Sequence, residues 1–321
     1  MEMVSIIIPV FNADKYINRC LSALQDLVYP KDKYEIIIID NGSSDQTVDI
    51  VKKYPVKLLI KIKCNISILR NWGANQAHGD IFAFIDADCV PQKDWLSQAS
   101  TLLQLDNVGA TGCWYALPKD TTLVERTWDI LTSIRREKIG TIDWVPSGNL
   151  IIRKEVFDQI NGFDEFLITS EDVDICQRII KAGLLIYSHP IVAVEHLGNP
   201  KTLKQFFLKE KWRGEGVLQN AFQKFPHIEL NNALLFGIIS FIFILGILGG
   251  IYLWFIRGQE QLFLFSILGL LIVPSLMTIK TLLERHQWSK FFILLLLFMV
   301  YGLARASSML NPRIWKNFLK G

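Results

Sequence analysis

The sequence predicts an α/β domain with a mostly parallel sheet, followed by an α-helical membrane domain. Three observations predict this class. Short apolar runs alternate with helix-like segments before Gly109, several of these runs end in polar residues, and residues 233–310 consist mainly of Leu, Ile, Phe, Gly and Val. Half of the 321 residues are hydrophobic, and the mean hydropathy of +0.28 is high for a fully soluble protein.

Four apolar runs are the candidate strands. Val4–Val10, Tyr34–Asp40 and Asp80–Asp86 are short and rich in β-branched or aromatic residues, and Val56–Ile62 is a weaker candidate. Runs of this length that are apolar on both faces are typical of buried parallel strands. We therefore expect these strands to lie inside a covered sheet.

Helices are predicted between and after these strands. Ala13–Leu27 has apolar residues at helical spacing with Asn12 as a possible N-cap, and Thr47–Tyr54 follows two serines. Glu171–Ala182 is a third helix, which Gly183 would end. Alternating strands and helices imply right-handed crossovers, so that both faces of the sheet are covered.

Polar residues follow three of the candidate strands, in Phe11-Asn12, Asp40–Ser43 and Asp86-Ala87-Asp88. Ligands of open α/β sheets bind beyond the carboxyl ends of the strands. Turn formation explains Asn41-Gly42, but it explains the two aspartates poorly because Cys89-Val90 is not turn-like. Two carboxylates one residue apart repel each other, which favours a cation between them.

Composition excludes several classes of protein. A net charge of +3 is too small to indicate nucleic-acid binding. Five dispersed cysteines without CxxC spacing favour free thiols in a reducing compartment. The first residues have too short an apolar run for a secretory signal, so we expect the first domain to be cytoplasmic. No GxGxxG follows the first strand, which disfavours a dinucleotide dehydrogenase.

Five segments together resemble the family 2 inverting glycosyltransferases, which have the GT-A fold, a Rossmann-like α/β architecture. The resemblance runs from Val4 to about Gly216, and the segments appear in the family's order: SIIIPVFNADKYINRCLSAL, IIIIDNGSSDQT, RNWGANQAHGDIFAFIDADCV with its DxD motif, SGNLIIRKEVFDQINGFDE and SEDVDICQRIIKAG. Any one segment is a weak signal. Five in order are a strong one.

The resemblance implies a role for each matching residue. The donor would be a nucleotide-diphosphate sugar, with a UDP-sugar favoured, and Mg²⁺ or Mn²⁺ would neutralise the leaving diphosphate. Asp172 would be the general base, with Glu171 as the second choice. Asp88 would bind the metal directly, assisted by Asp86 and His196. The substrate-binding residues would be Pro9, Phe11, Asn12, Asp40, Arg70, Asp86, Ser147, Gly148 and Asn149.

Four of these residues also have an ordinary structural explanation. His196 is as readily a packed histidine as a ligand near the metal, and Arg70 has the alternative of a solvated helix charge. Carboxylates such as Glu171 and Asp172 are also favourable in the first turn of a helix, because of the helix dipole.

The C-terminal part predicts membrane helices. Residues 234–255 and 262–279 carry no charge and are long enough to span a bilayer, whereas 291–310 contains Arg305. With the first domain inside, the first two spans obey the positive-inside rule, but a third would place the basic tail outside. We favour three spans, with an interfacial or re-entrant third segment as the alternative.

These observations divide the chain into four parts. They are a cytoplasmic catalytic domain over 1–200, a basic amphipathic juxtamembrane segment over 201–232, a membrane domain over 233–310 and a short basic tail over 311–321. The segment QFFLKEKWRGEG lacks the QxxRW spacing of processive synthases, which favours adding one sugar per acceptor.

The sequence therefore predicts a membrane-bound glycosyltransferase that adds one sugar to a lipid-linked (polyprenyl) saccharide in cell-surface polysaccharide synthesis. Two alternatives remain: an enzyme that uses bare polyprenyl phosphate, and a non-catalytic nucleotide-sugar-binding scaffold or transport subunit. An oligomer is compatible with the sequence, and no nucleic-acid partner is expected.

Overall fold

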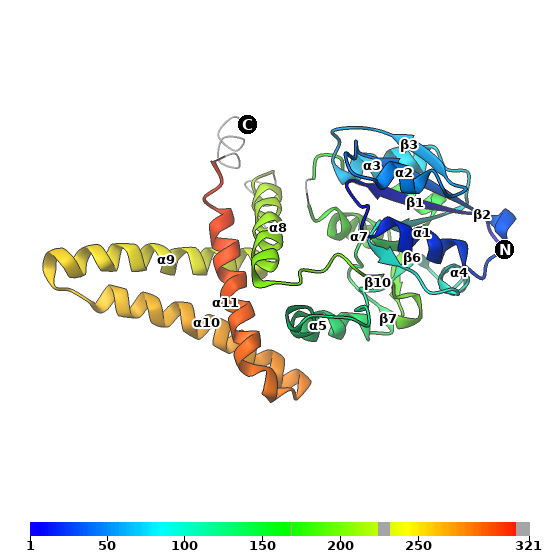
Figure 1. The fold of residues 1–321 in the computed structure, drawn as a ribbon. Coiled ribbons are helices and arrows are strands. Elements are labelled where there is room, and N and C mark those ends of the chain that lie inside the picture. The colour runs from blue at the N-terminus through cyan, green and yellow to red at the C-terminus, as the bar shows by residue number, and fades with distance from the viewer. Residues whose placement is uncertain (168, 224–231, 313–321) are drawn as a thin grey trace. The chain divides into compact units, whose positions relative to one another are not determined.

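The computed structural model describes residues 1–167, 169–223 and 232–312 (Figure 1). The chain forms two compact units. The sheet unit comprises residues 1–120 and 132–199, and the helical unit comprises 121–131 and 200–321. Parts of the expected juxtamembrane segment, residues 224–231, and of the expected basic tail, residues 313–321, lie outside the described residues.

The sheet unit is built on an eight-stranded mixed sheet in the order β3-β2-β1-β4-β8-β6-β9-β7. A separate two-stranded sheet pairs β5 with β10. The strands are β1 Val4–Val10, β2 Tyr34–Asp40, β3 Lys57–Ile60, β4 Ile81–Ile85, β5 Cys89–Val90, β6 Val108–Gly112, β7 Gly140–Thr141, β8 Asn149–Arg153, β9 Leu185–Ser188 and β10 Glu195–His196. All four predicted strands form, and β1 to β4 run parallel to one another.

Side chains alternate along these strands between two cores. In β4, Ile81, Ala83 and Ile85 pack on one face, while Phe82 and Phe84 pack on the other. A strand with a period of two is buried on both sides only when each face of its sheet is covered. The predicted double-sided α/β architecture is therefore confirmed.

Helices cover both faces of this sheet. Those of the sheet unit are α1 Ile17–Gln25, α2 Thr47–Val51, α3 Ile66–Asn75, α4 Trp95–Leu102, α6 Lys154–Gln159 and α7 Glu171–Lys181, together with the end of α5 Leu123–Arg136. Helices α1, α2 and α4 contribute to one core, and α3, α6 and α7 contribute to the other. As predicted, Gly183 follows α7 with a φ of +84°, a conformation that favours glycine.

Asn12 does not cap the first helix. Helix α1 begins at Ile17 with Tyr16 in the N-cap position, which has no side-chain cap. Asn12 instead adopts a φ of +49°, and its Oδ1 accepts a hydrogen bond from the Ser44 amide at 2.9 Å. Its amide donates to Ser43 Oγ at 2.9 Å, so Asn12 joins the loop after β1 to the loop after β2.

The helical unit contains α8 Leu203–Gln223, α9 Asn232–Arg257, α10 Gln261–Arg285 and α11 Phe291–Ser308. By length and composition, three helical stretches could cross a membrane, namely Asn232–Arg257, Gln261–Arg285 and Trp288–Ser308. The predicted C-terminal helical region with long apolar helices is thus confirmed.

The start of α5 belongs to the helical unit, which the sequence did not predict. Trp128 packs edge-to-face against Phe206 of α8 at 4.6 Å between ring centroids and lies near Tyr301 of α11 at 5.7 Å. Leu131 packs against the core that contains Leu282. A short insertion from the first part of the chain thus completes the packing of the helical unit.

Candidate active site

Three of the predicted site residues lie at the carboxyl ends of three parallel strands. Asn12 follows β1, Asp40 ends β2 and Asp86 follows β4. Strand β8 runs antiparallel to β4 and pairs Asn149 with Ile85, so the loop before β8 lies against the end of β4. Consequently Gly148 O accepts a hydrogen bond from the Asp86 amide at 3.4 Å.

A buried arginine links the first aspartate of the DxD motif to the helix that carries the predicted base. Arg70 Nη2 lies 2.8 Å from Asp86 Oδ1, and Arg70 Nη1 lies 2.9 Å from Glu171 Oε1. Ser147 Oγ donates to the same Glu171 oxygen at 2.9 Å, and Tyr115 Oη donates to Asp86 Oδ2 at 3.3 Å. We call these five residues the Arg70 network.

The position of Arg70 contradicts one of its two sequence-based interpretations. Its side chain is only 1% exposed, so it is not a solvated helix charge, and its role beside a diphosphate stays a prediction. Burial works to lower the pKa of Arg70, but the charges of Asp86 and Glu171 outweigh it and raise the pKa above its ordinary value. Arg70 therefore stays charged and holds two carboxylates in place.

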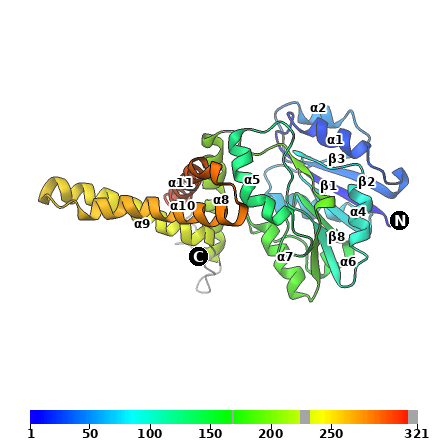
Figure 2. The ribbon, with the colours of Figure 1, turned by 90° about the horizontal axis from the view of Figure 1, so that it is seen from below.

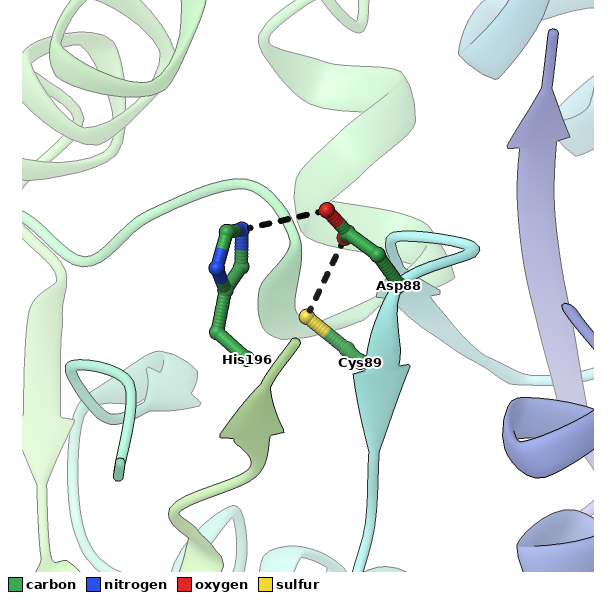
Figure 3. Close-up of side chains that lie close together, drawn as sticks. All are labelled: Asp88, Cys89 and His196. Atoms are coloured by element: carbon green, nitrogen blue, oxygen red, sulfur yellow. Dashed lines mark hydrogen bonds and ion pairs between the residues drawn. The ribbon is translucent and has the colours of Figure 1, made fainter. Parts of the chain in front are cut away.

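The second aspartate of the motif faces a histidine (Figure 3). Asp88 Oδ2 lies 3.5 Å from His196 Nε2, and the Cys89 thiol points toward Asp88 Oδ1 at 3.9 Å. The pairing of β5 with β10 sets His196 opposite Cys89 and so brings the histidine to the motif. The His196 ring also packs on Tyr115, with 4.5 Å between ring centroids, so it is at once a packed residue and a neighbour of Asp88.

Two glycines leave room for the carboxylates. A Cβ on Gly148 would lie 2.1 Å from Asp86 Oδ2, and one on Gly198 would lie 1.9 Å from Asp88 Oδ2. Any side chain at these positions would displace the neighbouring carboxylate. The family resemblance included Gly148, whereas Gly198 is apparent only from the structure.

The donor set around Asp88 fits a divalent cation. One ligand atom each of Asp88, Cys89 and His196 lies within 4.8 Å of the others. Hard cations such as Mg²⁺ and Mn²⁺ prefer carboxylate oxygen, and imidazole suits many transition metals. Asp88 and His196 are therefore the expected ligands. Both Asp86 oxygens are engaged by Arg70 and Tyr115, which favours an indirect role for Asp86.

Asp40 is buried, and only one of its two carboxylate oxygens accepts hydrogen bonds from described residues. Its Oδ2 accepts hydrogen bonds from the amides of Gly42 and Ser43 at 2.9 and 3.0 Å. Among the described residues, none hydrogen-bonds Oδ1, which is also buried. A buried acceptor without a partner is unfavourable unless a ligand supplies a donor. Phe11 is 59% exposed at the same edge, whereas Pro9 is buried within β1.

Asn149 lies behind the site rather than in it. Its side chain is fully buried, with Oδ1 accepting from Trp95 Nε1 at 3.0 Å and Nδ2 donating to the carbonyls of Cys113 and Val192. All of its hydrogen bonds are internal. Any effect of Asn149 on a pocket is therefore indirect, through the loop that carries Gly148.

The predicted base lies in the first turn of α7. Asp172 Oδ1 accepts a hydrogen bond from the Val173 amide at 2.9 Å, and Glu171 belongs to the Arg70 network. The preceding residue, Ser170, has a φ of +64°, a strained conformation for a residue with a side chain. The chain therefore turns sharply where it presents these two carboxylates.

Sequence reasoning missed Tyr115 and Gly198. Tyr115 lies beyond β6, where the hydrophobic pattern is weak, and nothing near it in the sequence marks it as a partner of Asp86. Burial and the nearby charge of Asp86 raise the pKa of Tyr115 well above its ordinary value, so it remains a hydrogen-bond donor at neutral pH. Gly198 follows His196 closely and could have been noticed only as a small residue beside a candidate ligand.

Comparisons with known proteins agree with this geometry. The family model described as "Glycosyl transferase family 2" matches residues 5–161, and the one described as "N-terminal domain of galactosyltransferase" matches residues 142–204. Among solved structures, the mannosyltransferase PcManGT of Pyrobaculum calidifontis, in complex with GDP-Man and Mn²⁺, has a TM-score of 0.58. The match has 17% identity and covers 94% of this chain and 87% of that chain, which shows that the fold is shared.

Curated relatives point to the same family. "Glycosyltransferase AglE" of Haloferax volcanii is 31% identical over 68% of this chain and 74% of its own length. A Methanococcus voltae protein is 24% identical over 82% of this chain and 91% of its own length. It is named "Dolichyl N-acetyl-alpha-D-glucosaminyl phosphate 3-beta-D-2,3-diacetamido-2,3-dideoxy-beta-D-glucuronosyltransferase". On the family match and the first of these relatives, the chain belongs to glycosyl transferase family 2.

Proposed function

We propose that this glycosyltransferase is a metal-dependent, inverting enzyme that moves one sugar from a nucleotide-diphosphate sugar to a lipid-linked saccharide. The observation that carries the proposal is the Arg70 network. It joins Asp86 to Glu171. Asp86 lies two residues before the expected metal ligand Asp88, and Glu171 directly precedes the candidate base Asp172. The donor end and the acceptor end of one displacement are thereby held together.

The donor would bind along the ends of β1 and β2. Asp40 Oδ1 is the buried acceptor that a base N–H would satisfy, and Phe11 offers an exposed ring beside it. We favour a UDP-sugar because a single buried acceptor suits the imide N–H of uracil. Asn12 would act mainly by holding the two loops together through Ser43 and Ser44.

The diphosphate end would lie at Asp88. Asp88 and His196 would hold Mg²⁺ or Mn²⁺, which when bound neutralises the charge that develops on the leaving diphosphate. PcManGT is a precedent for a nucleotide sugar with Mn²⁺ on this fold. Gly198 keeps the space beside Asp88 Oδ2 open, and Asp86 would contact the ribose or a metal-bound water.

Asp172 would take the proton of the acceptor hydroxyl as the bond to the sugar forms. Inversion needs one base on the face of the sugar opposite the leaving group. Glu171 is a weaker candidate because its Oε1 already accepts from Arg70 and Ser147, so it serves better as an anchor for the helix. Ser147 and Gly148 would border the sugar, since glycine permits close approach of the backbone.

The apolar helices and one relative support a lipid-linked acceptor. Three long apolar helices associate the chain with a membrane, which suits a lipid-linked acceptor. The name of the Methanococcus voltae relative describes transfer to a dolichyl phosphate that already carries a sugar. This precedent favours a lipid-linked saccharide over bare polyprenyl phosphate, and the absence of QxxRW favours single addition over polymerisation. The positive-inside rule supports a catalytic unit on the cytoplasmic face.

The test begins with purified full-length enzyme and Mn²⁺, screened against nucleotide sugars by the release of nucleotide. With the productive donor, Asp172→Asn should abolish transfer while nucleotide binding, measured by calorimetry, stays intact. Asp158→Asn, the same change at an exposed position of helix α6, should leave both unchanged. Transfer by Asp172→Asn near the wild-type rate would refute the base, and absence of turnover with every donor would favour a non-catalytic scaffold.

A second comparison separates the acceptors. Transfer should occur to polyprenyl diphosphate or phosphate that carries a saccharide and not to bare polyprenyl phosphate. The reverse preference would select the polyprenyl-phosphate enzyme, and addition of many sugars to one acceptor would contradict the single-addition proposal.

A further inference from the structure

Helices α8 and α11 of the helical unit lie side by side and run in the same direction. Glu210 of α8 forms a 2.6 Å ion pair with Arg305 of α11. One turn further along each helix, a Cβ on Gly214 would lie 2.6 Å from Ser308 Oγ. Since both contacts advance together along the two helices, α8 and α11 form a parallel pair.

Helix α8 cannot cross a bilayer. It carries six charged residues in one 12-residue stretch, namely Lys204, Lys209, Glu210, Lys211, Arg213 and Glu215. Glu210 forms ion pairs with Arg213 and Arg305, which neutralise part of this charge. Charged side chains in the middle of a membrane span are strongly disfavoured. Because α11 runs beside α8 along its length, α11 also cannot cross the bilayer while α8 stays outside it.

The other two apolar helices form a hairpin. A Cβ on Gly250 of α9 would meet the backbone of Phe263 in α10 at 2.5 Å, and one on Gly246 would meet Ser266 Oγ at 2.3 Å. These close approaches show that α9 and α10 run antiparallel. At 26 and 25 residues, each is long enough to cross the hydrocarbon core.

Both halves of α11 contact the same end of this hairpin. Leu294, near its start, shares a core with Leu282 at the end of α10. Near its other end, Arg305 lies beside Gly237 in the second turn of α9. A third span would instead place its two halves at opposite ends of the hairpin. Figures 1 and 2 show α11 and α8 passing across the hairpin rather than along it.

The exposed surface of α11 suits a helix that lies in the plane of the membrane. Phe292, Leu296 and Leu303 are exposed, and Leu310 continues the same stripe just beyond the helix. Their spacing of four and seven residues places them on one helical face. Arg305 faces away from this stripe, where it is buried against Glu210 and over the Tyr301 ring. The apolar stripe would lie in the acyl-chain boundary.

We propose that only α9 and α10 cross the membrane, and that the α8–α11 pair lies flat in the bilayer interface on the side where the catalytic unit resides. The partner is the lipid bilayer itself, through the stripe of Phe292, Leu296, Leu303 and Leu310. This arrangement also keeps the basic residues after Leu310 on the inside, as the positive-inside rule requires. It does not depend on the proposed sugar transfer.

The first test measures depth in the membrane. Nitroxide labels are placed on Cys variants of Phe292, Leu296, Leu303 and Leu310 in a Cys64→Ser background, since the other four cysteines are buried. The full-length protein is reconstituted in phosphatidylcholine–phosphatidylglycerol vesicles. The proposal predicts one shallow depth for all four labels. Matched labels at Ile242, Leu245, Tyr252 and Ile256 of α9 should change depth along the helix, and the same change along α11 would overturn the proposal.

The second test determines the side of each terminus. Reporters are fused to the full-length chain before Met1, within the Gly258–Gln259 turn, or after Gly321. The proposal predicts that the two terminal reporters lie on one side and the turn reporter on the other. A reporter after Gly321 on the same side as the turn would establish a third crossing.

Discussion

Each unit of the molecule contains a buried arginine that is paired with carboxylates, and the two sites differ in what surrounds them. Arg70 joins Asp86 and Glu171, whose side chains remain 27% and 13% exposed. Arg305 pairs with Glu210, whose side chain is only 2% exposed. Burial raises the pKa of Glu210, but Arg213 and Arg305 outweigh this effect and hold the pKa below its ordinary value. Glu210, like Arg70, therefore stays charged at neutral pH.

The difference in exposure of the carboxylates indicates a different role for each cluster. A buried ion pair is seldom more stable than well-packed apolar residues of similar volume, so its presence needs another reason. Around Arg70 we propose a chemical reason, because the two carboxylates belong to the candidate active site. Around Arg305 we propose a geometric reason, since the ion pair of Glu210 with Arg305 joins α8 to α11. Replacing each cluster should separate these two explanations.

The largest effect is expected at Arg70. Arg70→Met leaves two partly buried carboxylates without a counter-charge, which should lower the stability of the sheet unit by about 3–5 kcal/mol and abolish transfer. Thermal melting and turnover measure the two effects. Arg70→Lys should be intermediate in both, because one ammonium cannot form the two directed pairs of a guanidinium. A stable, active Arg70→Met enzyme would contradict the role of the network.

In the helical unit, the single and double changes should differ. Glu210→Leu leaves Arg305 buried and unpaired and should lower stability by about 3–5 kcal/mol, whereas Glu210→Leu with Arg305→Leu should be close to wild type. Melting of the detergent-solubilised protein measures both. If the double variant were as unstable as the single one, the pair would not be the source of the effect.

A matched pair of glycines should give the next largest difference. Gly198→Ala would displace the Asp88 carboxylate and should weaken Mn²⁺ binding about 10-fold or more with little change in melting. Gly214→Ala would crowd Ser308 and should lower stability by about 1–3 kcal/mol without changing Mn²⁺ affinity. Electron paramagnetic resonance of free Mn²⁺ measures the affinity. Equal Mn²⁺ affinity in Gly198→Ala and wild type would argue against Asp88 as a ligand.

The smallest effects are expected at two tyrosines. Tyr115→Phe removes the 3.3 Å hydrogen bond to Asp86 and should reduce kcat/KM several-fold, which corresponds to about 1 kcal/mol. Tyr301→Phe retains the ring under Arg305 and should change melting by less than about 0.5 kcal/mol. A large loss in Tyr301→Phe would mean that its hydroxyl, rather than its ring, supports the arginine.

The local parts of this molecule could be predicted from the sequence. All four early strands, the helix from Glu171 and the long apolar helices follow from hydrophobic periodicity and length, because these patterns record which faces of a segment are buried. The family motifs located Asp86, Asp88 and Asp172. Capping was less predictable: Asn12 had the right chemistry for an N-cap but bridges two loops instead.

What remained hidden was the pairing of residues far apart in the sequence. Arg70 and Glu171 are 101 residues apart, and Glu210 and Arg305 are 95 apart. The direction of β8 brings Gly148 to Asp86, and the short pairing of β5 with β10 brings His196 to Asp88. Hydropathy records that a strand is buried but not which strand lies beside it or in which direction.

The sequence by itself determined the order of strands and helices, the carboxylates at the strand ends and the long apolar helices after residue 231. Only the tertiary structure decided that Arg70 pairs with both Asp86 and Glu171. It also decided that Arg305 pairs with Glu210 of α8, the helix that precedes the apolar hairpin. The physical reason is that burial is a property of each segment, which its own residues encode, whereas a buried charge is stable only with a partner that the folded chain supplies.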